Sequence, residues 1–279
     1  MYGRGFKLFN LMGFEVRLHS SWLILGALVV WSLGGGFFPH RFPGYSQADY
    51  WWMAIGGAVG LLFSIVIHEF AHSVVARHYG IPMRGITLFI FGGVAEMGDE
   101  PPSAKSEFLM AIAGPLTSFL IAACSFGVAA ILNTGTAPGI GPVFAYLAWI
   151  NGLLGLFNLI PAFPLDGGRV LRAAIWAKKR DLVSSTRIAS WIGSAFGILL
   201  MLLGAWTIFQ GNMVGGVWWI LIGMFVRNAS NMSYRQVLYR RAMQERHMQE
   251  LLDAEQAEPY IDVEPVRESE EHEPHGANR

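Results

Sequence analysis

Charged side chains are scarce in this sequence: Asp, Glu, Lys and Arg make up only 14% of its 279 residues, whereas hydrophobic residues make up 53%. Soluble domains average about 25% charged residues. The 20 basic and 20 acidic residues cancel to a formal net charge of zero, so no excess of positive charge favours a nucleic-acid partner. The composition argues against a soluble domain and predicts an integral membrane protein that lies in the lipid bilayer.

The sequence contains only one cysteine and no recognisable cleavage site for a leader. The single cysteine, Cys124, excludes an internal disulfide, and its apolar surroundings indicate a role in helix packing. The N-terminal segment contains Arg4, Lys7, Glu15 and Arg17 but no small-residue cleavage site, so we expect no removable signal peptide.

Six apolar runs have lengths that suit a bilayer, whose hydrocarbon core of roughly 30 Å needs about 20 residues of helix. These runs are Ser20–Phe38, Tyr50–Tyr79, Ser106–Asn133, Val143–Pro164, Arg187–Phe209 and Met213–Val226. The last run is short for a span. The pattern predicts an all-α polytopic membrane protein with about six transmembrane helices.

Between the second and third runs, Arg84–Met97 is too short and too rich in glycine for a spanning helix. Within it, Ile86–Phe91 is rich in β-branched and aromatic residues and is flanked by glycines, which predicts a strand. We expect a small membrane-embedded β-hairpin or re-entrant loop, and an ordinary surface hairpin is the alternative. A free edge on this strand could pair with an unwound substrate segment.

The distribution of charge predicts the topology. With a cytoplasmic N-terminus and six crossings, Arg41 is the only Lys or Arg in an outer loop, as the positive-inside rule requires. Residues 1–19 would form a cytoplasmic N-terminal segment and residues 20–226 the transmembrane domain. Residues 227–279 would form a cytoplasmic helix and an acidic, disordered tail, which either solubilises this end of the chain or binds a partner.

The strongest chemical signal is the sequence HEFAH, which lies near the end of the second apolar run and contains His68, Glu69 and His72. On a helix, two histidines four residues apart share one face, so both imidazoles can reach one zinc ion. A solvated polar turn is the alternative, but ionisable groups after a run without charge are costly in lipid unless they are paired or bind something.

Asp166 is the natural third zinc ligand, because a catalytic zinc site uses three protein ligands and one open position. It follows Pro161 and Pro164, which should break the fourth helix. It also falls on the same side of the membrane as the two histidines. Alternatively, Asp166 could cap the basic helix that follows. Asn158 could hold substrate backbone or stabilise an oxyanion, or it could satisfy carbonyls that Pro161 leaves free.

Glu69 would serve as the general base, since it lies beside a ligand yet points about 100° away from it. Zinc would acidify a water molecule and polarise a carbonyl, while Glu69 moves the proton to the leaving amine. The implied reaction is hydrolysis of a peptide bond. A metal-ion transporter is a rival from another class, and a catalytically inactive membrane scaffold is a second rival.

These residues resemble the site-2 protease family of intramembrane zinc metalloproteases, peptidase family M50. The resemblance covers about residues 50–180, the expected catalytic core. It rests on HEFAHS at His68–Ser73, FGGVAEM at Phe91–Met97, AGPLTS at Ala113–Ser118 and NLIPAFPLDGG at Asn158–Gly168.

The resemblance implies a zinc cofactor held by His68, His72 and Asp166, with Glu69 as the catalytic base. It further implies that Asn158, Pro161 and Pro164 handle the substrate, a transmembrane protein cleaved by regulated intramembrane proteolysis. The distribution of Lys and Arg would place the active site towards the cytoplasmic side of the cell membrane. We expect neither the PDZ domain nor the CBS domains that some members carry.

Overall fold

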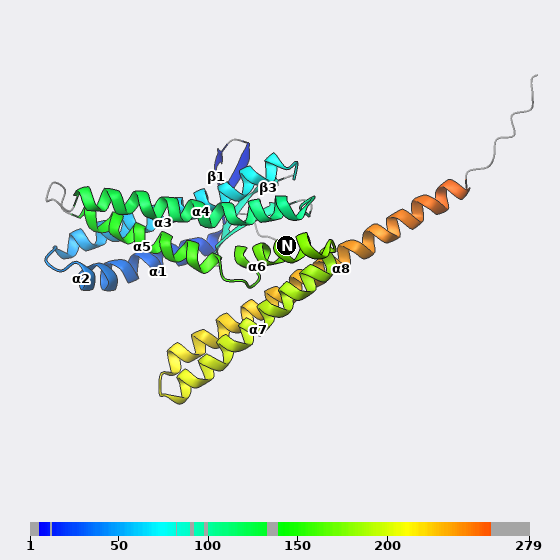
Figure 1. Cartoon of the computed structure of the whole chain (residues 1–279). Helices are drawn as coiled ribbons and strands as arrows, with labels where there is room; N and C mark the ends of the chain where they lie inside the picture. The colour runs from blue at the N-terminus through cyan, green and yellow to red at the C-terminus, as the bar shows by residue number, and fades with distance from the viewer. Residues whose placement is uncertain are drawn as a thin grey trace, which may run out of the picture. The chain divides into compact units, whose positions relative to one another are not determined.

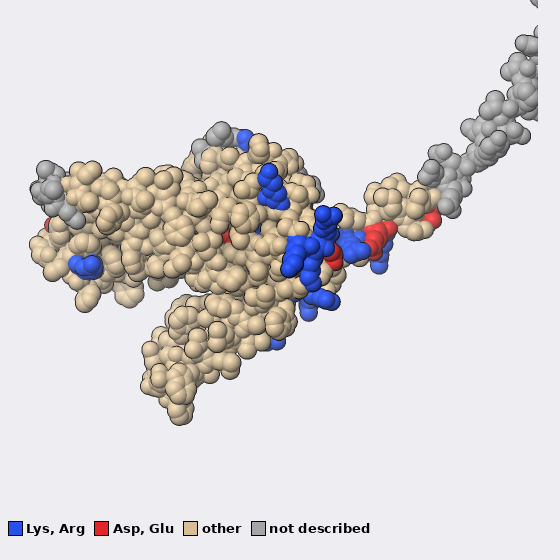
Figure 2. All heavy atoms as spheres, viewed as in Figure 1, with Lys and Arg blue, Asp and Glu red and all other residues tan. Residues whose placement is uncertain are grey.

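The structure, a computed structural model, describes residues 6–11, 13–81, 83–89, 92–97, 100–132 and 139–257. Six helical segments in this part of the chain are long and apolar enough to cross a membrane. The sides of these helices that face the viewer in Figure 2 carry few charged side chains. Helix α6 (Asp166–Lys179), by contrast, ends in Lys178 and Lys179. The expected all-α polytopic architecture with six spans is confirmed, and the protein is an integral, multi-pass membrane protein.

The first span is made of three consecutive pieces. Helix α1 (Ser20–Ser32) passes into a π-helical turn (Leu33–Phe37) and then into the short helix α2 (Phe38–Arg41). The π-helical turn contains Gly34, Gly35 and Gly36, which have weak helix propensity.

The second, third and fourth spans form the centre of the molecule. They are α3 (Gln47–His78), α4 (Ala104–Leu132) and α5 (Ile140–Asn158). Each of the three packs against the other two, and Figure 1 shows them running side by side. A buried cluster that includes Phe38, Tyr50 and Tyr146 joins α2, α3 and α5 at one end.

Helix α5 stops at Asn158, before the prolines that were predicted to break it. Residues 159–165 form a non-helical turn that contains Pro161 and Pro164. The chain then enters α6 (Asp166–Lys179). The helix break predicted from the prolines is therefore present, and it places Asp166 at the start of a new helix.

The last two spans form a helical hairpin. Helix α7 (Leu182–Phe209) is followed by α8 (Met213–Ala257), which is longer than the predicted sixth run. Close packing of small residues joins them: a Cβ added to Gly197 would lie 2.6 Å from the carbonyl oxygen of Gly223. The chain divides into two compact units after Val237, and the second unit begins with the remainder of α8. The predicted acidic tail lies outside the described residues from residue 258 onward.

A four-stranded sheet accompanies the helices. Its strands are β1 (Phe6–Leu11), β2 (Phe14–Leu18), β3 (Met83–Phe89) and β4 (Gly92–Met97). They lie in the order β1-β2-β3-β4, with β2 parallel to β3 and the other pairs antiparallel. The predicted hairpin is therefore present as β3 and β4, but the two N-terminal strands were not recognised in the sequence.

One hypothesis about the sheet is wrong. The strand that begins near Ile86 was expected to offer a free edge, but β3 pairs with β2 on one side and β4 on the other. Ile90 and Phe91, which were assigned to the same strand, lie outside the described residues. The sheet's outer strands are β1 and β4.

Strand β2 anchors the sheet to α3. Its alternating pattern buries Phe14, Val16 and Leu18, and the last two pack with Val66 of α3 in one apolar cluster. Phe14 makes an edge-on contact with the ring of Phe70, with ring centroids 5.8 Å apart. The sheet is thus fixed to the same turns of α3 that carry the His-Glu-x-x-His sequence.

Candidate metal centre

Helix α3 places the two histidines of the motif on one buried face. His68 and His72 are 4% and 6% exposed, and their ring centroids lie 4.9 Å apart. Their Nε2 atoms approach to 3.2 Å. The four-residue spacing therefore produces the shared face that the sequence predicts.

Asp166 meets both histidines. Its Oδ2 atom lies 3.2 Å from the Nε2 atom of His68 and 3.2 Å from that of His72. The capping interpretation of Asp166 is wrong, because Leu165 occupies the N-cap position and α6 has no side-chain cap bond. The carboxylate is directed to the imidazoles and not to the helix end.

Close packing of the turn before α6 sets the place of Asp166. A Cβ added to Gly168 would lie 2.6 Å from the backbone nitrogen of Phe163, so the first turn of α6 lies directly on the preceding turn. Ser230 of α8 donates a hydrogen bond to the carbonyl of Phe163 at 3.0 Å. Gly168 is therefore needed for the close approach of these two turns.

The three ligand atoms fit a zinc ion. Each side of their triangle is 3.2 Å long. Tetrahedral zinc with bonds of 2.0 to 2.1 Å separates its ligand atoms by about 3.3 to 3.4 Å. His68, His72 and Asp166 form a metal-competent group among the described residues, and their nitrogen and oxygen atoms are ligands that zinc accepts.

Hydrogen bonds on the far side of each ring support this fit. The Nδ1 atom of His72 lies 2.7 Å from the carbonyl oxygen of Met110, which can only accept, so Nδ1 is the donor. In the neutral ring, this leaves a lone pair on Nε2. The Nδ1 atom of His68 lies 2.8 Å from the hydroxyl oxygen of Ser118, which can accept in the same way. Two lone pairs and a carboxylate then face one point, which favours a cation there.

The charge state of Asp166 suits a ligand. Burial raises the pKa of Asp166, whereas imidazoles of His68 and His72 that carry a proton on Nε2 lower the pKa well below its usual range. The carboxylate is therefore ionised beside a cation, and a metal ion that takes the place of those protons has the same effect.

Glu69 lies next to this group on α3. Its side chain is half-buried, and it interacts electrostatically with both imidazoles, with Asp166 and with Arg169. One residue along a helix turns about 100°, so Glu69 borders the group without sharing the face of the two histidines.

The three residues predicted to handle substrate lie on the path into α6. The side-chain amide of Asn158 donates to the carbonyl of Leu154 at 3.0 Å, within its own helix. This acceptor is not the Phe157 carbonyl that Pro161 would leave free. Pro161 and Pro164 are exposed in the turn between α5 and α6.

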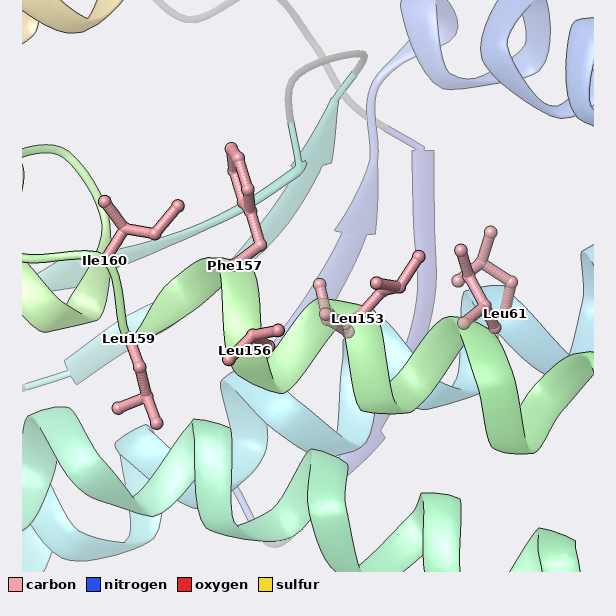
Figure 3. A pocket seen from close by; sticks show the side chains of 8 residues that line it. Leu61, Leu153, Leu156, Phe157, Leu159 and Ile160 are labelled. Carbon is pink, nitrogen blue, oxygen red and sulfur yellow. The ribbon is translucent and has the colours of Figure 1, made fainter.

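An apolar groove lies along α5 beside this turn, with a volume of about 740 Å³. Leu61 of α3 lines one part of it, and Leu153, Phe157 and Ile160 line another (Figure 3). The three ligand candidates are not among its lining residues. The groove can hold an apolar segment, but it is separate from the chemistry of the metal centre.

Helix α4 also contributes to this centre, which the sequence did not predict. Gly114 faces the imidazoles so closely that an added Cβ would lie 2.6 Å from the Nε2 atom of His68. Met110 lies four residues before Gly114, and its carbonyl oxygen contacts the Nδ1 atom of His72. Ser118 lies four residues after Gly114, and its hydroxyl oxygen contacts the Nδ1 atom of His68. The helical spacing of 110, 114 and 118 was a signal that could have revealed this face.

Comparisons with known proteins show the family of this chain. A family model described as Peptidase family M50 matches residues 56–138 and 132–203. Rip3 of Mycobacterium tuberculosis is 42% identical over 219 residues, which cover 78% of this chain and 55% of that protein. Zinc metalloprotease MJ0392 of Methanocaldococcus jannaschii is 34% identical over 198 residues, which cover 71% of this chain and 53% of that protein. The chain thus spans about half the length of these relatives.

A solved structure is also similar. The Site-2 Protease from Methanocaldococcus jannaschii aligns with a TM-score of 0.53 at 33% sequence identity. The alignment covers 83% of this chain and 95% of that one.

Proposed function

The chain belongs to peptidase family M50, and from this membership we propose that it is a zinc-dependent intramembrane endopeptidase that cleaves a membrane-anchored protein within or near its transmembrane segment. One observation carries the proposal: two imidazole nitrogens and one carboxylate oxygen form a triangle with sides of 3.2 Å inside a membrane-spanning helix bundle.

In this proposal His68, His72 and Asp166 hold the ion. Zinc bound at this position would polarise the scissile carbonyl and acidify a water molecule. His68 and His72 lie on α3 and Asp166 lies on α6, so a bound ion would also link α6 to α3. The Nδ1 hydrogen bonds of the two histidines keep their Nε2 atoms turned towards one point.

Glu69 is the general base of the proposed reaction. It accepts a proton from the attacking water and donates that proton to the nitrogen of the leaving amine as the C–N bond breaks. Asn158, Pro161 and Pro164 are the proposed substrate-handling residues, since the turn that contains the prolines leads directly to Asp166.

The proposed substrate is a transmembrane protein, and the proposed role is regulated intramembrane proteolysis. Residues 20–226 would form the protease domain, with a catalytic core at about 50–180. Residues 1–19 and 227–279 would lie in the cytoplasm. The proposed location is the cell membrane, with the active site towards the cytoplasmic side, which rests on the distribution of Lys and Arg.

Metal removal tests the activity directly. The protein purified in detergent should carry about one zinc per chain and should cleave a reporter anchored by one transmembrane helix with Gly and Pro near its cytoplasmic end. A chelator should abolish cleavage, and added zinc should restore it. Ion flux through liposomes without cleavage would indicate a transporter instead, and bound zinc without cleavage would indicate an inactive scaffold.

Reporter fusions test the orientation. A reporter placed after Asn278 should read as cytoplasmic, and one inserted at Gly139 should read as external, because Lys and Arg are concentrated in the segments assigned to the inside. The opposite pattern would contradict the charge argument and move the active site to the outer side.

A further inference from the structure

One face of α4 touches or supports every member of the candidate metal centre. Glu107, Met110, Gly114 and Ser118 follow one another at spacings of three, four and four residues, so they share one side of the helix. All four are buried. We call this set the α4 stripe.

At one end of the stripe, Ser118 determines how His68 is held. Its hydroxyl oxygen lies 2.8 Å from the Nδ1 atom of His68, and the side chain is fully buried. If Nδ1 donates to this hydroxyl, Nε2 keeps its lone pair and points at His72 and Asp166. Without the hydroxyl, the buried Nδ1 atom would lose the partner that orients the ring.

At the other end, Glu107 holds the helix that carries Asp166. The Nε atom of Arg172, in α6, donates to Oε1 of Glu107 at 2.6 Å, and a second guanidinium nitrogen also contacts that oxygen. Glu107 is 0% exposed and Arg172 6%. Arg172 also contacts Glu100 at 3.3 Å and lies over the ring of Phe163, 5.6 Å from its centroid.

A buried ion pair often adds little to the free energy of unfolding. Removing both charges and inserting apolar side chains of similar volume is often neutral or stabilising, because the desolvation cost of two ions disappears. An ion pair that joins α4 to α6, however, also fixes the register of α6. Since Asp166 is the first residue of α6, that register sets where its carboxylate lies.

We propose that Ser118 and the Glu107–Arg172 pair are positioning residues. Ser118 orients the ring of His68, and the ion pair fixes the helix that carries Asp166. Together they preorganise the three ligand atoms for the metal. Met110 completes the stripe through its backbone carbonyl, which orients His72. This inference rests on the proposed function, because it assumes that zinc is the ion bound.

The first experiment compares Ser118→Ala with Thr117→Val. Thr117 is the matched control, because it is the neighbouring residue and its hydroxyl donates to the carbonyl of Ala113 within α4. Zinc affinity is measured by competition with a chelator, and the ligand field is read from the absorption spectrum of the Co²⁺-substituted protein. Ser118→Ala should bind zinc about 10- to 100-fold more weakly and change the Co²⁺ spectrum. Thr117→Val should match the wild type in both.

The second experiment replaces both charges with apolar residues, in the double variant Glu107→Leu with Arg172→Met. Its thermal midpoint without metal should equal or exceed that of the wild type. Its zinc affinity should nevertheless fall by about 10-fold or more, because the ion pair no longer fixes the register of α6 against α4. A purely structural pair would leave zinc affinity unchanged.

The outcomes separate this inference from the proposed function. If the wild type binds no zinc, the proposed function fails. If the wild type binds zinc and cleaves its reporter while Ser118→Ala keeps wild-type affinity and spectrum, the positioning role of Ser118 is overturned. Wild-type zinc affinity in the folded double variant overturns the role of the ion pair, and failure of that variant to fold assigns the pair to stability instead.

Discussion

Glu69→Gln should retain its zinc and lose cleavage by about 10²- to 10⁴-fold, the range that general acid–base catalysis contributes. Gln has nearly the same size as Glu but cannot accept a proton at neutral pH. The three candidate ligands are unchanged, so metal content should stay at about one per chain. Zinc content and the rate of reporter cleavage, measured on the same preparation, check this prediction.

The zinc content of Glu69→Gln is the control, because it distinguishes a general base from a residue that supports the metal centre. If Glu69→Gln loses both zinc and cleavage, the carboxylate supports the metal centre and is not a separate base. If the variant cleaves at the wild-type rate, the proposed mechanism is wrong. The position of Glu69 beside the ligand face of α3, and not on it, is the reason to expect metal and activity to separate.

The local parts of this architecture could be predicted from sequence because each depends on neighbours along the chain. The spacing of His68 and His72 determines that they share a helical face, whatever packs around them. The two prolines after Asn158 interrupt a helix because they lack amide hydrogens. Even the place of Asp166 could be inferred, because the order of the spans brings the ends of α3 and α5 to the same side of the membrane.

The sheet could not be predicted in the same way. Strands β2 and β3 are parallel neighbours, yet all of α1 and α3 lies between them in the chain. Pairing between segments so far apart in the chain leaves no local pattern in the sequence. At the N-terminus, Lys7, Glu15 and Arg17 form an exposed charge cluster across β1 and β2. Because this N-terminal partner was not recognised, β3 was wrongly given a free edge.

Helix α4 was recognised as a span, but its role in the site was not. The glycine and proline in its middle indicated close packing in general terms. They did not show that the space left by Gly114 is filled by the two imidazoles. Glu107 was the missed signal, because a lone carboxylate in an apolar run needs a partner, and Arg172 in α6 was available.

Loss of a residue that only hydrogen-bonds a metal ligand typically lowers metal affinity by about 10- to 100-fold. Asp166→Ala should lower zinc affinity by more than this, because the substitution removes a direct ligand. Cleavage should fall to background. A matched control is Asp181→Ala, since Asp181 also stands at a helix start but caps α7 through the backbone amides of Val183 and Ser184. The control should lose about 1 kcal/mol of stability and keep its zinc. Metal content and thermal unfolding of both variants distinguish a ligand from a cap, and full zinc retention by Asp166→Ala would remove Asp166 from the metal centre.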